Sequence, residues 1–219
     1  MFIGHFGLGL AAKRIAPNIS LGTSLMAVQF LDLVWPTLLL LNAEHVVIHP
    51  ELGGNRTLEF SDYPITHSLL FAIGWSMLFG SVYWLIKKDR REALILGAAV
   101  LSHWLLDLVV HFHDLPLFPW GSTKVGFGLW SSVEITTVIE GLLFGVGVYL
   151  YLRATVAKNK TARIVFWVLI VLLLLVQVSN FVAPPPVNVT ALGWYGQFQW
   201  LFVALGYWAD RHTVPSQNT

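Results

Sequence analysis

The chain has 219 residues, of which 56% are hydrophobic and 11% are charged, and it carries a formal net charge of +1. In soluble domains about a quarter of the residues are usually charged. The low charge of this chain and its mean hydropathy of +0.67 therefore exclude an ordinary soluble protein. The chain contains no cysteine, which excludes disulfides and thiolate metal sites.

Apolar segments long enough to cross a bilayer recur along the whole chain. A transmembrane helix needs about 20 mostly apolar residues, and the sequence predicts such spans at 21–41, 64–86, 93–113, 130–152, 164–183 and 192–209. These spans leave little room for a separate soluble domain. We therefore expect residues 1–219 to form a single all-α integral membrane bundle of six transmembrane helices plus a short half-spanning N-terminal helix.

That N-terminal helix is expected at residues 2–12, a glycine-rich apolar segment followed by Lys13 and Arg14. At 1.5 Å per residue it covers about 16 Å, roughly half a bilayer. A half-spanning helix would carry His5 to about the middle of the membrane. A helix lying flat at the interface would leave His5 among the lipid headgroups.

The first full span, 21–41, carries an acidic residue near its centre. Asp32 lies there, and Pro36 is expected to kink the helix just beyond it. The following loop, 42–63, contains Glu44 and several other acidic and histidine residues. Much of this loop fits an ordinary solvated segment.

The second and third spans carry histidines at comparable depth. His67 lies about one turn inside the outer boundary of the second span, where Pro64 suits a helix start. In the third span His103, Asp107 and His111 are four residues apart and share one helix face. His103 and Asp107 could bind one metal ion or form an interhelical hydrogen-bond pair. His111 lies about 12 Å from His103 along the axis, so a second ion, a substrate or an outer-shell role suits it better.

The fourth span contains Glu134 near the outer surface and Glu140 deeper. We expect these two residues to line the cavity, or one of them to act as a general base. Depths estimated from the span ends agree for Asp32, His103 and Asp107, with His67 and Glu134 nearer the outer mouth. Leaving both aspartates charged without partners would cost roughly 5–7 kcal/mol. A divalent ion held by imidazoles and carboxylates would offset that cost. Such a ligand set suits zinc, with manganese or iron as alternatives.

Basic residues predict the orientation in the membrane. With the spans drawn as above, every Lys and Arg except Arg56 and Lys124 falls on one side. The positive-inside rule then places both termini in the cytoplasm. We interpret the basic clusters as topology signals with anionic-lipid contacts, and we expect no nucleic-acid partner.

The order of these motifs resembles a known family. The series His5-Phe-Gly-Leu-Gly, Asp32, Thr66-His67-Ser68 and Ser102-His103-x-x-x-Asp107 resembles the YdjM/YbcI-like group of bacterial inner-membrane proteins, described as membrane-bound metal-dependent hydrolases, over roughly residues 1–111. The resemblance implies five metal ligands: His5, Asp32, His67, His103 and Asp107.

The chain departs from that family pattern twice. Many relatives have Asp-x-Asp where this chain has Asp32-Leu33-Val34, and His-Arg-Gly where it has residues 61–64. Asp62, Glu44 or His45 could substitute for the missing polar groups, or activity could be lost.

The sequence therefore predicts metal-assisted hydrolysis of a lipid-derived or membrane-embedded ester or phosphoester at an outward-facing site. Membrane lipids and a small-molecule or lipid substrate are the expected partners, and Glu134 or Glu44 would accept the proton. One alternative is a proton- or cation-coupled transporter. The sequence shows no pair of interrupted helices, which argues against this alternative. The other is a non-catalytic metal-binding membrane scaffold.

Overall fold

The computed structural model describes residues 1–52 and 57–216, and most of these residues are helical. The helices are α1 (Ile3–Ile15), α2 (Leu21–Val28), α3 (Phe30–Leu40), α4 (Pro64–His67), α5 (Leu69–Lys87), α6 (Arg90–Val110), the 3-10 turn η2 (Leu129–Ser131), α7 (Val133–Ala154), α8 (Lys160–Val182), α9 (Val189–Gln197) and α10 (Gln199–Arg211). Three antiparallel strand pairs join β1 (His45–Ile48) to β2 (Leu58–Asp62), β3 (Leu115–Pro116) to β4 (Lys124–Val125), and β5 (Thr155–Ala157) to β6 (Thr213–Pro215).

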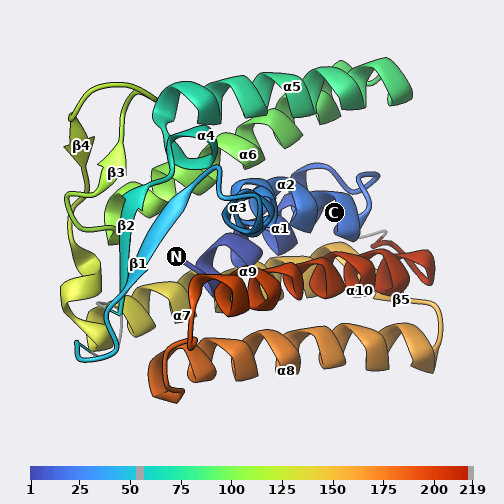
Figure 1. The fold of residues 1–219 in the computed structure, drawn as a ribbon. Coiled ribbons are helices and arrows are strands. Elements are labelled where there is room, and N and C mark those ends of the chain that lie inside the picture. Colours follow the sequence, from blue (N-terminus) through green and yellow to red (C-terminus); the bar gives the residue numbers. More distant parts are fainter. Residues whose placement is uncertain (53–56, 217–219) are drawn as a thin grey trace.

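The long helices form a bundle around the N-terminal helix. Figure 1 shows α5 and α6 side by side along one edge, α8 and α10 along the opposite edge, and α1, α2 and α3 between them. Helix α1 packs against α7, α2 and α6, and His5 is completely buried. The prediction of a short N-terminal helix is therefore confirmed, and the alternative of a helix lying flat at the surface is wrong.

The structure supports fewer continuous spans than the six that the sequence predicts. In the described part of the chain, α5, α6, α7 and α8 are long and apolar enough to cross a membrane. The predicted first span is the pair α2 and α3, which are bent by 61° and could together form a fifth. The predicted sixth span corresponds to α9 and α10, which meet at Phe198 and have 9 and 13 residues. Six continuous spans are thus not confirmed.

Side-chain caps define where most of the helices begin. The side chains of Ser20, Ser68, Asp89, Ser132 and Asn159 each accept a hydrogen bond from the backbone N–H three residues later. Such caps satisfy N–H groups that have no partner within the helix. Between Lys87 and Asp89, Lys88 adopts a left-handed conformation with φ of 59°, which turns the chain from α5 into α6.

The break between α2 and α3 lies at Gln29, not at the proline that the sequence singles out. Helix α3 continues through Pro36, so the helix is interrupted before Asp32 and not at the proline beyond it. A proline lacks the N–H that would bond the carbonyl four residues earlier. The Gln199 side-chain amide donates to that carbonyl, Asp32 O, at 3.3 Å, which compensates for the missing bond.

Two glycines allow α1 to lie directly against α7. A Cβ atom added to Gly7 would lie 2.6 Å from the backbone oxygen of Leu143. On the other side of the contact, Gly147 faces the backbone of Gly7. Only a residue without a side chain permits this approach, which fixes the depth of α1 in the bundle.

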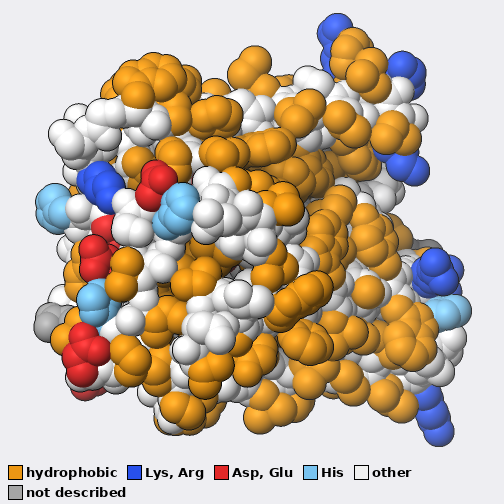
Figure 2. Space-filling model, in the orientation of Figure 1, with side chains coloured by type: hydrophobic (Ala, Val, Ile, Leu, Met, Phe, Trp, Pro, Cys, Tyr) orange, Lys and Arg blue, Asp and Glu red, His pale blue; other side chains and the backbone are white. Residues whose placement is uncertain are grey.

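Charge is segregated between the two ends of the bundle. In Figure 2 the Lys and Arg side chains gather at the end where α5 gives way to α6, and acidic and histidine side chains gather at the end that carries the β1–β2 hairpin. The sides are largely hydrophobic. This distribution agrees with the basic asymmetry found in the sequence.

Candidate metal centre

Helix α6 presents two buried polar side chains to the interior. His103 and Asp107 are 0% and 2% exposed, and His103 Nε2 lies 3.1 Å from Asp107 Oδ2. Their spacing of one helical turn places them on the same face, as the sequence predicts. Asp107 is the residue around which the other polar groups assemble.

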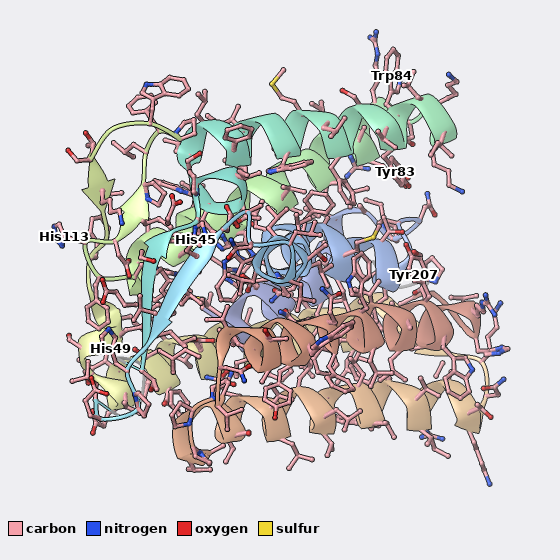
Figure 3. All side chains as sticks on the ribbon, viewed as in Figure 1. His45, His49, Tyr83, Trp84, His113 and Tyr207 are labelled. Atoms are coloured by element: carbon pink, nitrogen blue, oxygen red, sulfur yellow. The ribbon has the colours of Figure 1, made fainter. Side chains whose placement is uncertain are left out.

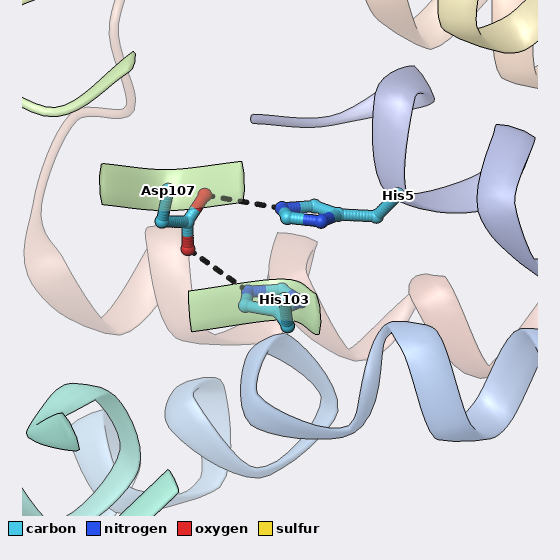
Figure 4. Close-up of side chains that lie close together, drawn as sticks. All are labelled: His5, His103 and Asp107. Atoms are coloured by element: carbon cyan, nitrogen blue, oxygen red, sulfur yellow. Dashed lines mark hydrogen bonds and ion pairs between the residues drawn. The ribbon is translucent and has the colours of Figure 1, made fainter. Parts of the chain in front are cut away.

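Helix α1 places a histidine next to the other oxygen of the Asp107 carboxylate. His5 Nε2 lies 3.1 Å from Asp107 Oδ1, and its ring stacks on that of His103 with 3.8 Å between the centroids. Figure 4 shows Asp107 at the edge of the stacked imidazoles, with one carboxylate oxygen directed toward each ring. The amino group of Met1 also lies 2.7 Å from Asp107 Oδ1, so Met1 is in the bundle interior and not at its basic end.

Helices α3 and α4 complete the cluster from the opposite side. His67 Nε2 is 3.4 Å from Asp32 Oδ1 and 3.8 Å from Asp107 Oδ2. The same Asp32 oxygen is 3.6 Å from His103 Nε2. The five predicted ligands therefore form two overlapping groups that share His103, one with Asp32 and His67 and the other with His5 and Asp107, and within each group the potential ligand atoms lie within 4.8 Å of one another.

Several separations in these groups are close to those between the ligands of a small divalent ion. With zinc–ligand bonds of about 2.0–2.1 Å, a regular tetrahedron places its ligand atoms about 3.3–3.4 Å apart. The four separations from His67 Nε2 and His103 Nε2 to Asp32 Oδ1 and Asp107 Oδ2 lie between 3.1 and 3.8 Å. His103 Nε2 is also buried without a hydrogen-bond partner in the described structure. The donor set is thus suited to a cation between these atoms.

The helix break at Gln29 determines which nitrogen of His103 is available. His103 Nδ1 lies 2.8 Å from the carbonyl oxygen of Val28, which can only accept, so Nδ1 carries the proton. The neutral ring then presents a lone pair on Nε2 to Asp32 and Asp107. A cation or a second proton at this nitrogen would let it face both carboxylates favourably, whereas the amino group of Met1 contacts only the other oxygen of Asp107. No motif in the sequence indicates the role of the Val28 carbonyl.

Asp32 is the most accessible member of the cluster, with a side chain that is 22% exposed. Its Oδ2 accepts a hydrogen bond from Gln29 Nε2 at 3.1 Å, and the same amide donates to Gln199 Oε1 at 2.6 Å. The interruption between α9 and α10 therefore lies beside Asp32. Gln29 and Gln199 were not predicted as site residues, because a glutamine in an apolar helix is not specific for any site.

The two predicted proton acceptors have other partners. Glu134 is exposed in the first turn of α7, and its carboxylate accepts a hydrogen bond from Ser132 Oγ at 2.9 Å. The structure does not bring it to the cluster. Glu44 is buried, and its two oxygens accept from the backbone N–H and the hydroxyl of Thr66.

Other predicted polar residues also lie outside the cluster. His111 Nδ1 is 3.0 Å from Asp114 Oδ1, and its ring packs on Trp130. Glu140 is buried but accepts from the backbone N–H groups at the start of α1, at 2.8 Å from Phe2 N. His45 pairs with Asp62 on the exposed hairpin. Figure 3 shows His45, His49 and His113 near the hairpin end of the bundle.

A comparison with protein families identifies the relationship that these motifs indicate. The family model described as YdjM inner membrane protein matches residues 1–183, which extends well beyond the resemblance at residues 1–111. Neither the curated proteins nor the solved structures contain a significant match. The match covers most of the chain and agrees with its apolar helices, so this multi-pass membrane protein belongs to the YdjM inner membrane protein family.

Proposed function

We propose that the chain is a metal-dependent hydrolase that cleaves a lipid-derived or membrane-embedded ester or phosphoester. The observation that carries the proposal is the convergence of His67, His103 and Asp107 with the Asp32 carboxylate beside them, from three helices and at contacts of 3.1 to 3.8 Å. Two carboxylates and two neutral imidazoles carry a charge of −2; the amino group of Met1 compensates part of it at Asp107 Oδ1, and a cation beside the imidazoles would balance the rest. Burying such a set without a cation or protons would be strongly unfavourable.

Each residue of the centre has a distinct task. A divalent ion, zinc or alternatively manganese or iron, would supply a bound water of lowered pKa and polarise the ester. His67 and His103 offer Nε2, and Asp107 offers Oδ2. His5 Nε2 has two alternative roles: it donates to Asp107 Oδ1 and orients that carboxylate, or it binds an ion together with His103 and Asp107.

We assign to Asp32, and not to Glu134 or Glu44, the role of accepting the proton from the attacking water. Asp32 Oδ1 faces the two imidazoles, while Oδ2 is bonded to Gln29 on the accessible side. Glu134 is exposed beside Ser132. Glu44 uses both oxygens on Thr66. Asp32 is thus the carboxylate that combines contact with the centre and partial access.

The position of the centre supports a membrane-derived substrate. Exposed aromatic side chains lie around the α9–α10 interruption next to Asp32, among them Tyr195, Phe198 and Trp200. A lipid could bring its polar group to the centre laterally while its acyl chains stay between apolar helix faces. With the basic end of the bundle in the cytoplasm, the hairpin end would face outward and both α1 and α10 would end on the cytoplasmic side.

The decisive experiment measures bound metal and turnover on the same sample. Protein purified without chelator is expected to contain close to one equivalent of metal by elemental analysis and to hydrolyse at least one member of a phospholipid and phosphoester panel. His103→Ala is expected to lose both properties. Metal-free, inactive wild-type protein would refute the proposal.

Cation transport is a second candidate, supported by the two interrupted helix pairs. The sequence shows no such pair, yet α2–α3 and α9–α10 are both interrupted, and Gln29 at one break bonds Gln199 beside the other. Transporters often bind their ions where helices are broken. Metal uptake into proteoliposomes without any hydrolysis of the panel would favour this candidate over the hydrolase.

A further inference from the structure

We propose that Glu44 and Thr66 form a relay that positions His67, holding it in the tautomer whose Nε2 can bind a cation. The inference rests on the proposed function in one respect, because it takes the centre as a cation site. It gives Glu44 a positioning role in place of the proton-accepting role that the sequence suggested.

Glu44 is an acidic side chain buried to 1% exposure. Its Oε1 accepts from Thr66 N at 2.8 Å, and its Oε2 accepts from Thr66 Oγ1 at 2.7 Å. In the part of the chain that the structure describes, no Lys, Arg or His forms a salt bridge with it. A buried carboxylate without a cationic partner is costly, so its two bonds to a single threonine call for an explanation.

The hydrogen-bond directions along the relay follow from proton counting. A hydroxyl has one proton to donate, and when Glu44 is ionised Thr66 Oγ1 donates that proton to Glu44 Oε2. Toward His67 Nδ1, which lies 2.7 Å away, the same oxygen can only accept. His67 Nδ1 must therefore carry the proton, which leaves the lone pair on Nε2.

That lone pair is directed at the centre. His67 Nε2 is the ring atom that approaches Asp32 Oδ1 and Asp107 Oδ2. The arrangement matches that of His103, whose Nδ1 is held by the Val28 carbonyl. Metal-binding histidines generally donate the proton of their other nitrogen to an acceptor, and losing that partner typically weakens metal binding about 10–100-fold.

Thr66 and Glu44 come from segments that the fold must bring together. Glu44 lies between α3 and β1, whereas Thr66 is in the short helix α4, directly before His67. The base of the hairpin is thereby connected to the centre through two side chains. Thr66 is completely buried, so Thr66→Val keeps its shape and removes only the hydroxyl.

The first test measures the tautomer in metal-free protein. Histidine labelled with 15N, with the His67 signals assigned by their loss in His67→Gln, reports which ring nitrogen carries the proton. We expect a protonated Nδ1 in the wild type and in Thr66→Ser, and a mixture or reversal in Thr66→Val and Glu44→Gln. A proton on Nε2 in the wild type, or no change in Thr66→Val, would overturn the relay.

The second test measures zinc affinity by competition with a chelating dye. Thr66→Val and Glu44→Gln should bind zinc about 10–100-fold more weakly than the wild type, and Thr66→Ser should restore binding. The control is Thr136→Val, which removes another buried hydroxyl, bonded to Leu129 O at 2.8 Å, and should leave the affinity unchanged. Equal weakening in the control would contradict a specific relay.

The two tests separate this inference from the proposed function. If wild-type protein binds no zinc, the hydrolase fails, and the tautomer of His67 alone decides whether the relay exists. If zinc binds normally but Thr66→Val leaves both the tautomer and the affinity unchanged, the relay fails while the metal centre stands. A loss of folding in Glu44→Gln leaves the comparison of Thr66→Val with Thr66→Ser to decide.

Discussion

Replacing Gly7 by alanine should push α1 away from α7 and disturb the centre without touching any of its polar residues. The added Cβ atom would lie 2.6 Å from Leu143 O and 2.9 Å from Phe144 Cα. Ordinary contacts of a Cβ begin near 3.4 Å, and a backbone cannot rotate out of the way. The helices must separate by several tenths of an ångström, which lengthens the bond from His5 to Asp107.

Overpacking of this kind typically destabilises a protein by about 1–3 kcal/mol. For a chain of this length each kcal/mol shifts the Tm by about 2–4 °C, so we expect Gly7→Ala to lower the Tm by about 2–12 °C. Zinc affinity should fall in the same variant, because α1 carries His5. Thermal unfolding in detergent and competition with a chelating dye measure the two effects.

Gly145 provides the matched control on α7. A Cβ added there meets no atom within 4 Å, so Gly145→Ala should leave zinc binding intact and stabilise the helix by up to about 1 kcal/mol. If Gly7→Ala were as stable as Gly145→Ala and bound zinc equally well, the close crossing of α1 and α7 would be refuted.

The remaining predictions concern the centre, the outer hairpin and the helix interruptions. Asp107→Asn should abolish stoichiometric metal binding, whereas Glu134→Gln should retain both metal and turnover, and loss of turnover in the latter would return a catalytic role to Glu134. The hydrogen bonds that the His49 ring donates to Glu59 and to Glu51 raise the pKa of His49 above its ordinary value of 6.5. This stabilising contact is therefore complete below pH 6.5 and is lost as the pH rises through the raised pKa, and NMR titration should show a lower pKa for His49 in Glu59→Gln. Gln199→Leu should destabilise the fold by about 1 kcal/mol in thermal unfolding, since it leaves a carbonyl of α3 without its donor, and unchanged stability would show that this bond contributes nothing.

The helix-borne part of the centre was predictable because its geometry is local. His103 and Asp107 are one turn apart, and any α-helix places them on one face. The prediction of Asp32 and His67 as site residues required two further arguments, their matching depths in separate spans and the family resemblance. Their meeting within 3.4 Å is a tertiary result that neither periodicity nor hydropathy can supply.

Glu134 shows what an estimate of depth leaves out. Depth along a span says how far a residue lies from the surface but not which way its side chain points around the helix axis. Glu134 is exposed, and Glu140, six residues later, turns toward the start of α1. Two acidic residues of one helix thus have entirely different surroundings, and the packing of α7 against α1 determines this difference.

The helix break beside the centre was unpredictable for a related reason. Pro36 is the strongest breaking signal in the segment, yet α3 runs through it because Gln199 donates to the carbonyl that the proline leaves free. Gln29 has no such signal and lies at the actual break. Tertiary hydrogen bonds from α10 outweigh the local preference of the chain.

The position of that break also accounts for the arrangement around His103. In a continuous helix the carbonyl of Val28 would accept from the backbone N–H of Asp32, four residues later. The bend at Gln29 frees the carbonyl, which takes the proton-bearing Nδ1 of His103 at 2.8 Å. It also turns the Asp32 carboxylate to within 3.6 Å of the opposite nitrogen of the same ring. One interruption therefore fixes both the tautomer of an imidazole and the carboxylate that faces its lone pair, and this pairing is stable only if a cation or a second proton lies between them.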